Sequence, residues 1–168
     1  LDYDHSFTMM GQPTAPVVPA TFALGEALGA NGRKILEAYV AGFEVTAKLV
    51  YSLSESAHDG WHAPSTLGSF GAAAACSKLL GLDATKTQMA LGITASMASG
   101  IVANFGTMTK PLHVGLGARN SVLAAKLAAG GYTAAGMDWS RDGKWLAATT
   151  LGDSLVLVDP ATGTIGGM

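Results

Sequence analysis

The sequence has little charge and almost no cysteine. Only 13 % of its 168 residues are charged, while 49 % are apolar. A surface this poor in charge indicates that a partner covers much of it, so we expect a homodimer; a truncated chain with an exposed core is the alternative. The single cysteine, Cys76, excludes an internal disulfide and a cysteine-ligated iron–sulfur cluster within one chain. Because Cys76 lies in an Ala-rich run, we expect it to be a small buried packing residue.

Basic character and targeting signals are also missing. The formal net charge is −2 and the pI is near 6, so there is no basic surface for nucleic acid. The first residues are acidic, without the basic region of a signal peptide, and without an initiator Met, so we expect the native start to lie upstream. The uncharged run 87–109 is long enough to span a bilayer, but its polar residues favour a buried helix. We therefore expect a cytoplasmic protein with no membrane and no nucleic-acid partner.

Apolar periodicity predicts a mainly α fold of about five helices with short connections. On the second helix, the residues expected to form the apolar face are Ile35, Leu36, Tyr39, Val40, Phe43, Val45, Ala47 and Val50. Gly81 is the expected C-terminal cap of the third helix, and Asp83 is the expected N-cap of the fourth. The predicted helices span residues 17–28, 33–52, 64–80, 84–103 and 111–129.

The character of the sequence changes near Gly136, where we place a domain boundary. Turn signals at Asp142-Gly143, Gly152-Asp153 and 160–163 separate short apolar or alternating runs. Residues 137–168 are therefore predicted to form a short β-meander of about three strands, after a helical domain at 1–136. The edges of such a meander are unpaired unless something covers them.

The most informative stretch is 104–113, Asn-Phe-Gly-Thr-Met-Thr-Lys-Pro-Leu-His. Pro111 fits the first turn of a helix, and Lys110 stands beside it. A helix N-terminus with free N–H groups and an adjacent ammonium is suited to a carboxylate or a phosphate. The sequence has no metal-ligand spacing, no Gly-x-Ser-x-Gly elbow and no Walker-type loop.

Several separate motifs stand in a characteristic order along the first 135 residues. Together they resemble the MmgE/PrpD family, which includes 2-methylcitrate dehydratases, cis-aconitate decarboxylases and iminodisuccinate epimerases. The motifs are Leu1-Asp2-Tyr3-Asp4, Pro13-Thr14-Ala15-Pro16-Val17-Val18-Pro19-Ala20, Ala41-Gly42-Phe43-Glu44-Val45, Gly60-Trp61-His62, Ser65-Thr66-Leu67-Gly68, residues 104–113 and Ala118-Arg119.

The resemblance implies a cofactor-free lyase or isomerase for a small di- or tricarboxylate. A proton is removed beside a carboxylate, and dehydration, decarboxylation or epimerisation follows. A His near neutral pKa can exchange protons, and a Lys at a helix start can hold a carboxylate and stabilise enolate-like charge. Carried over by position, the catalytic candidates are Asp2, His62 and Lys110, and the substrate-binding candidates are Ser6, Gln12 and His113.

The sequence also departs from the family. Gln12 stands where the family has a His before Pro, and an amide orients a carboxylate without exchanging protons. The family's N-terminal helices and later lid domain are missing, while 137–168 resemble a single β-propeller blade. Two alternatives therefore stay open beside an enzyme: a non-catalytic helical remnant that self-associates, and an interaction module that pairs through its β segment. If the site is intact, Asp2, His62 and Lys110 should meet at one cleft.

Overall fold

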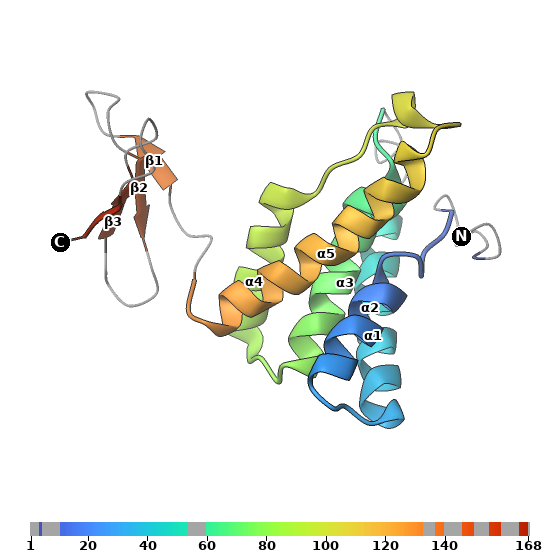
Figure 1. Cartoon of the computed structure of the whole chain (residues 1–168), viewed down its shortest axis with the longest axis horizontal. Coiled ribbons are helices and arrows are strands. Elements are labelled where there is room, and N and C mark those ends of the chain that lie inside the picture. The colour runs from blue at the N-terminus through green and yellow to red at the C-terminus, as the bar shows by residue number, and fades with distance from the viewer. Residues whose placement is uncertain are drawn as a thin grey trace.

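The chain is mainly helical, as the sequence predicts. The computed structural model describes residue 4, residues 11–53 and 60–132, and four short strands beyond them. Within this part of the chain, the helices lie side by side, while the strands form a separate sheet (Figure 1). The helical elements are α1 (Val17–Ala27), α2 (Gly32–Leu53), α3 (Ala63–Leu79), α4 (Ala84–Met97), the 3-10 helix η2 (Val102–Asn104) and α5 (Thr109–Ala129).

Helix α3 is the centre of the helical part. It contacts α1, α2, α4 and α5, and its residues from Ala63 to Ser77 are almost all buried. A helix that is enclosed on all sides needs small residues where its neighbours approach closely. Gly42 of α2 faces Gly71 of α3 so closely that a Cβ at Gly42 would lie 2.5 Å from the Gly71 carbonyl oxygen. The Gly- and Ala-rich sequence of α3 therefore permits a core with little space between helices.

The expected apolar face of α2 is confirmed at Ala47 and Val50, which are buried, but this close packing corrects it at two positions. Leu36 and Val40 are 65 % and 57 % exposed instead of buried. The face turned to α3 needs short side chains, because longer ones would not fit between two backbones in near contact. The buried residues of α2 are Ala38, Gly42, Thr46, Ala47 and Val50.

The local signals between α3 and α4 are confirmed. The Asp83 carboxylate accepts a hydrogen bond from the Lys86 N–H at 2.8 Å, as an N-cap does. Gly81 ends the preceding helix with a φ of +66°, in the left-handed region that favours glycine. Cys76 is fully buried in a core to which all five α-helices contribute.

Helix α4 is shorter than expected, because it ends at Met97 instead of near residue 103. Ala98 is already extended, and Gly100 has a φ of +123°, which takes the chain out of the helix. The chain then runs beside the segment before α3, where Ile101 forms an antiparallel bridge with Trp61 and the Gly100 carbonyl accepts from the His62 N–H. This return places residues 99–104 beside the start of α3.

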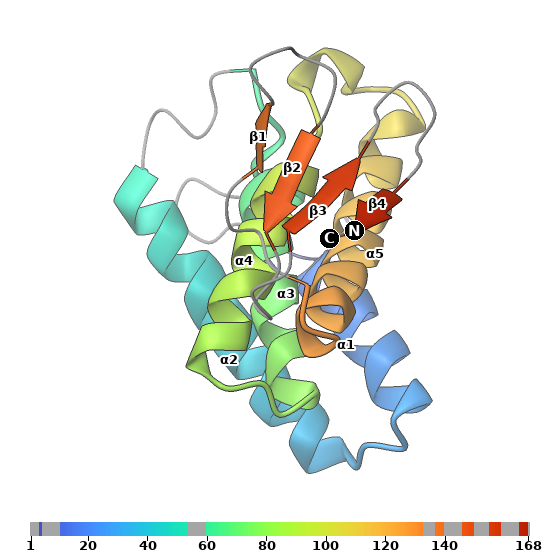
Figure 2. The same ribbon diagram turned by 90° about the vertical axis from the view of Figure 1, so that its left-hand side faces the viewer.

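The C-terminal strands form an antiparallel sheet in the consecutive order β1-β2-β3-β4 (Figure 2). A meander is confirmed, but it has four strands where about three were expected, since the pattern of the last strand is weakened by two glycines. The resemblance to a propeller blade and the boundary near Gly136 stay predictions, because the turn residues and Gly136 lie outside the described residues. The strands are β1 (Met137–Trp139), β2 (Leu146–Thr149), β3 (Leu155–Val158) and β4 (Ile165–Gly167).

In the described part of the chain, no helix has the length and apolarity needed to cross a membrane.

Candidate functional site

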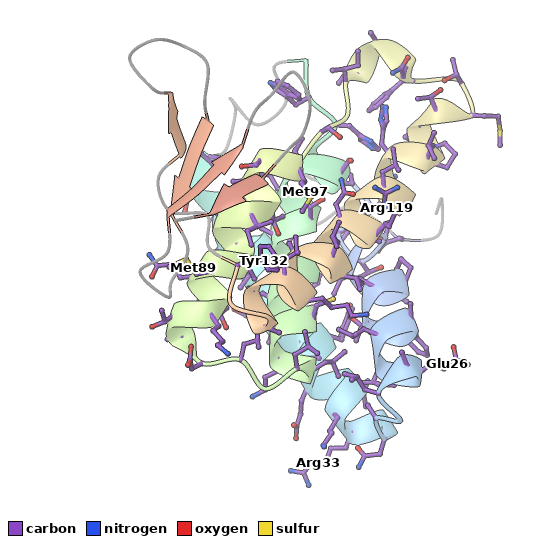
Figure 3. The ribbon with its side chains drawn as sticks, turned by 60° about the vertical axis from the view of Figure 1, so that its left-hand side comes forward. Glu26, Arg33, Met89, Met97, Arg119 and Tyr132 are labelled. Atoms are coloured by element: carbon purple, nitrogen blue, oxygen red, sulfur yellow. The ribbon has the colours of Figure 1, made fainter. Side chains whose placement is uncertain are left out.

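The candidate site lies where α3 and α5 begin. These two helices run in the same direction. The Ser65 hydroxyl of α3 donates to the His113 carbonyl of α5, and farther along both helices the Ser121 hydroxyl of α5 donates to the Ser69 carbonyl of α3. Parallel packing brings both N-termini to one end of the molecule. Arg33 points outward at the opposite end, where α1 connects to α2 (Figure 3).

Two helix N-termini and one ammonium make this end attractive for an anion. Lys110 belongs to the first turn of α5, and neither α3 nor α5 carries an acidic residue in its first turn. Each N-terminus contributes partial positive charge from its backbone N–H groups. The Lys110 ammonium lies 5.1 Å from the centroid of the Phe105 ring, which holds it near the site by a cation–π contact. The first N–H groups of α5 are not free, because those of Thr109 and Lys110 donate to Thr107 and Pro111 has none. The anion site expected at residues 104–113 therefore depends mainly on the Lys110 ammonium and stays a prediction.

Two adjoining cavities of about 360 Å³ and 230 Å³ share three of their lining residues, Gln12, His62 and Lys110. No described residue that lines either cavity is acidic. Gln12 adopts a φ of +52°, a left-handed conformation that is uncommon for a residue other than glycine. The structure thus brings together three of the six residues predicted from the sequence. Asp2 and Ser6 lie outside the described residues, so their part in the cleft stays a prediction.

His62 differs from the near-neutral imidazole that the sequence suggests. His62 is only 2 % exposed. This burial, together with the nearby charges of His113 and Lys110, lowers the pKa of its imidazole to about 4. A neutral ring at physiological pH donates or accepts a hydrogen bond but seldom carries charge. Its Nε2 atom is buried and has no hydrogen-bond partner among the described residues. Phe105 meets the ring edge-on, with centroids 4.9 Å apart.

His113 lies next to His62 and is not one of the residues that line the two cavities. The two Nδ1 atoms are 3.4 Å apart, and the other ring nitrogen of His113, Nε2, is 3.4 Å from the Asn104 amide nitrogen. These distances form a polar chain that runs from Asn104 through His113 to His62. The geometry favours a role for His113 that acts through His62 instead of direct contact with a ligand.

Some residues around this polar chain were not singled out from the sequence. The single hydroxyl proton of Ser65 is shared between two carbonyls, since its oxygen lies 2.6 Å from the Ser99 carbonyl and 2.8 Å from the His113 carbonyl. Gly100 lies close to the His113 ring, since a Cβ at Gly100 would lie 3.2 Å from Nδ1 of His113. Asn104 and its partner His113 both belong to the stretch 104–113, but the sequence does not show that these two side chains meet. Among the described residues, no group of three or more His, Cys, Asp or Glu residues is placed to hold a metal ion.

Comparison with known proteins shows which proteins this chain is similar to. Residues 1–155 match the MmgE/PrpD N-terminal domain. The chain is 40 % identical over 135 residues to cis-aconitate decarboxylase from Homo sapiens, a match that covers 76 % of this chain and 28 % of that protein. It is 38 % identical over 127 residues to cis-aconitate decarboxylase from Aspergillus terreus, covering 70 % of this chain and 26 % of the relative. The match thus spans little more than a quarter of the length of these relatives.

Proposed function

The chain belongs to the MmgE/PrpD family, and from this premise we propose that it is a cofactor-free lyase or isomerase of a small di- or tricarboxylate. Decarboxylation of cis-aconitate is the reaction that its similarity to two decarboxylases favours. One observation carries the proposal: His62 and Lys110 line the same cavities at two helix N-termini, with no acidic residue among the described lining. Such a cavity suits a multiply charged organic anion.

The proposed roles follow from the chemistry of each group. Lys110 binds a substrate carboxylate and stabilises the negative charge that develops beside it. Loss of carbon dioxide breaks the bond from carbon to the carboxylate, leaves the electron pair conjugated with a neighbouring carboxylate, and ends when carbon takes up a proton. His62 supplies a hydrogen-bonding nitrogen inside this low-dielectric site. Gln12 and Ser6 orient the substrate carboxylates, and Asp2 is the proposed proton-exchanging carboxyl group.

Turnover tests this proposal. The purified chain is incubated with cis-aconitate, 2-methylcitrate and related acids, and product formation is followed spectroscopically. We expect turnover of at least one acid, abolished by Lys110→Ala and retained by Lys34→Ala, which removes the same charge from the exposed start of α2. No turnover of any acid by the unmodified chain would contradict activity, and loss in both lysine variants would contradict the assignment of the site.

We also propose that the chain self-associates and works in the cytoplasm. A groove of about 380 Å³ between α1 and α2 is lined almost entirely by apolar atoms, and Phe22 and Leu36 on it are 60 % and 65 % exposed. Covering such a surface removes apolar area from water. Light scattering after gel filtration should report a dimer, and Leu36→Asp should shift it to the monomer. A monomeric unmodified chain at high concentration would contradict self-association.

A further inference from the structure

The polar chain that ends at His62 has a direction. The Asn104 amide nitrogen, 3.4 Å from Nε2 of His113, can only donate a hydrogen bond. The His113 nitrogen that faces it must therefore accept. A neutral imidazole carries one proton, so the proton of His113 lies on Nδ1, which points at Nδ1 of His62 at 3.4 Å. Nδ1 of His62 is then the acceptor, and its own proton lies on Nε2.

The surroundings hold the His113 ring in the orientation that this chain of hydrogen bonds needs. The Ser65 hydroxyl donates to the His113 carbonyl and fixes its backbone at the first turns of the two parallel helices. On another side, Gly100 lies so close that an added Cβ would be 3.2 Å from Cγ and Nδ1 of His113. His113 is 8 % exposed, so water does not compete freely for its nitrogens. The ring therefore has fixed neighbours at both nitrogens.

The far end of the polar chain is unsatisfied in the described part of the protein. His62 Nε2 is buried without a hydrogen-bond partner, although His62 is a lining residue of both cavities. A buried polar nitrogen without a partner costs about 1–3 kcal/mol. Because Nε2 itself is closed to solvent, a ligand oxygen recovers this cost only if the cavity wall beside His62 shifts on binding. Because Nδ1 is turned to His113, Nε2 lies on the opposite side of the ring.

We infer that Asn104 and His113 are positioning residues that hold His62 as its Nε2–H tautomer, so that His62 presents a neutral donor to a ligand carboxylate. The identity of the ligand rests on the proposed function, but the tautomer does not. The charged or titratable groups that act on His62 are His113 and Lys110, and both disfavour a second proton on its ring. His62 is thereby suited to stabilise developing negative charge by a hydrogen bond while remaining neutral.

The tautomers are measured directly on the full chain, without substrate, from long-range proton–nitrogen correlations of ¹⁵N-labelled histidine. Spectra are recorded above the pH at which either ring carries two protons. We expect His62 to be protonated on Nε2 and His113 on Nδ1. The opposite tautomer of His62 in the unmodified protein would overturn the inference, and this measurement needs no variant to fold.

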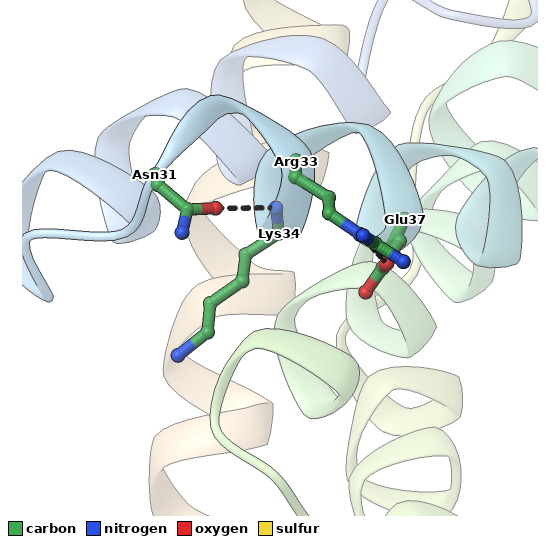
Figure 4. A network of polar contacts seen from close by, with 4 residues as sticks. All are labelled: Asn31, Arg33, Lys34 and Glu37. Atoms are coloured by element: carbon green, nitrogen blue, oxygen red, sulfur yellow. Dashed lines mark hydrogen bonds and ion pairs between the residues drawn. The ribbon is translucent and has the colours of Figure 1, made fainter.

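A substitution reverses the direction of the polar chain. In Asn104→Asp, the carboxylate can only accept, so His113 should move its proton to Nε2 and His62 should move its proton to Nδ1. The matched control is Asn31→Asp. It changes the net charge by the same amount, but at a position far from the site. There the Asn31 side-chain oxygen accepts from the Lys34 N–H at 3.0 Å, beside the Arg33–Glu37 ion pair, and a carboxylate oxygen can do the same (Figure 4). Unchanged His62 and His113 tautomers in Asn104→Asp would overturn the inference.

These outcomes are separable from those of the proposed function. Turnover without the expected tautomer would leave the enzyme proposal standing and remove the positioning role of His113. The expected tautomer without turnover would establish the positioning role and count against activity of this chain. If both hold, Asn104→Asp should lower kcat more than it raises KM. The substitution removes the Nε2–H of His62, which donates to the negative charge that develops during the reaction, while Lys110 still holds the substrate.

Discussion

The Nδ1 atoms of His62 and His113 lie 3.4 Å apart, although 51 positions separate these residues in the sequence. The contact exists because α3 and α5 run parallel, with one histidine just before α3 and the other in the first turns of α5. The His62 ring cannot take a second proton without placing positive charge beside His113 and Lys110, which lowers its pKa. This pair therefore links the stability of the fold to the chemistry of the cavity.

The first prediction concerns stability against pH. The pKa of His62 is lowered from its usual value of 6.5, which applies to the unfolded chain, to about 4 in the folded chain. Between these two pH values, the unfolded chain binds a proton that the folded chain does not. Stability from this group is fully present above pH 6.5 and declines as pH falls toward 4. The loss should reach up to roughly 3 kcal/mol in the free energy of unfolding. Urea unfolding at several pH values measures it.

The comparison for this prediction is His62→Gln, which cannot titrate. Its unfolding free energy should fall less steeply between pH 6.5 and 4 than that of the unmodified chain, whatever its stability at neutral pH. Equal slopes in the two proteins would mean that His62 is not held neutral by the fold.

The second prediction concerns Gly100, whose φ of +123° strains any residue with a Cβ. In Gly100→Ala, the new methyl would meet the Ser65 hydroxyl at 3.1 Å and the His113 ring at 3.2 Å. We expect a loss of roughly 1–3 kcal/mol in stability, with displaced NMR signals of His113. The control is Gly115→Ala on the exposed side of α5, where a Cβ meets open space and should stabilise the helix by about 0.5–1 kcal/mol. Equal effects of the two substitutions would contradict the close approach.

The third prediction tests the close contact of α2 and α3. In Gly42→Ala, the Cβ would lie 2.5 Å from the Gly71 carbonyl oxygen, and this backbone atom cannot move aside alone. The helices must separate, so we expect thermal unfolding to show a loss of about 2 kcal/mol or more. Gly32→Ala at the start of the same helix has free space and should change stability by less than about 0.5 kcal/mol. A neutral Gly42→Ala would show that α2 and α3 are farther apart.

Local signals predicted most of the helical fold. The Asp83 cap and the turn at Gly81 depend on neighbouring residues only, so the sequence contains all that determines them. The burial of α2 depends on what faces it. Ala47 and Val50 of the expected apolar face are buried, but Leu36 and Val40 are exposed. The close approach of Gly42 to Gly71 leaves room only for small residues where α2 meets α3.

The site was predictable where a motif identified its residues. Gln12, His62 and Lys110 belong to recognisable segments, and the structure places them around shared cavities. The contact of His113 with His62 was not predictable, because it needs the parallel packing of two helices. The role of Gly100 also depends on that packing, because its neighbours come from α3 and α5.

The most direct test of the whole account is a titration of the chain with cis-aconitate, followed by ¹H–¹⁵N correlation spectra. Binding should shift backbone signals around Gln12, His62 and Lys110, and the shifts should disappear in Lys110→Ala but remain in Lys34→Ala. Binding of the trianion should weaken as the salt concentration rises. Shifts that are absent, or that lie at the α1–α2 end of the molecule, would contradict a carboxylate site at the starts of α3 and α5.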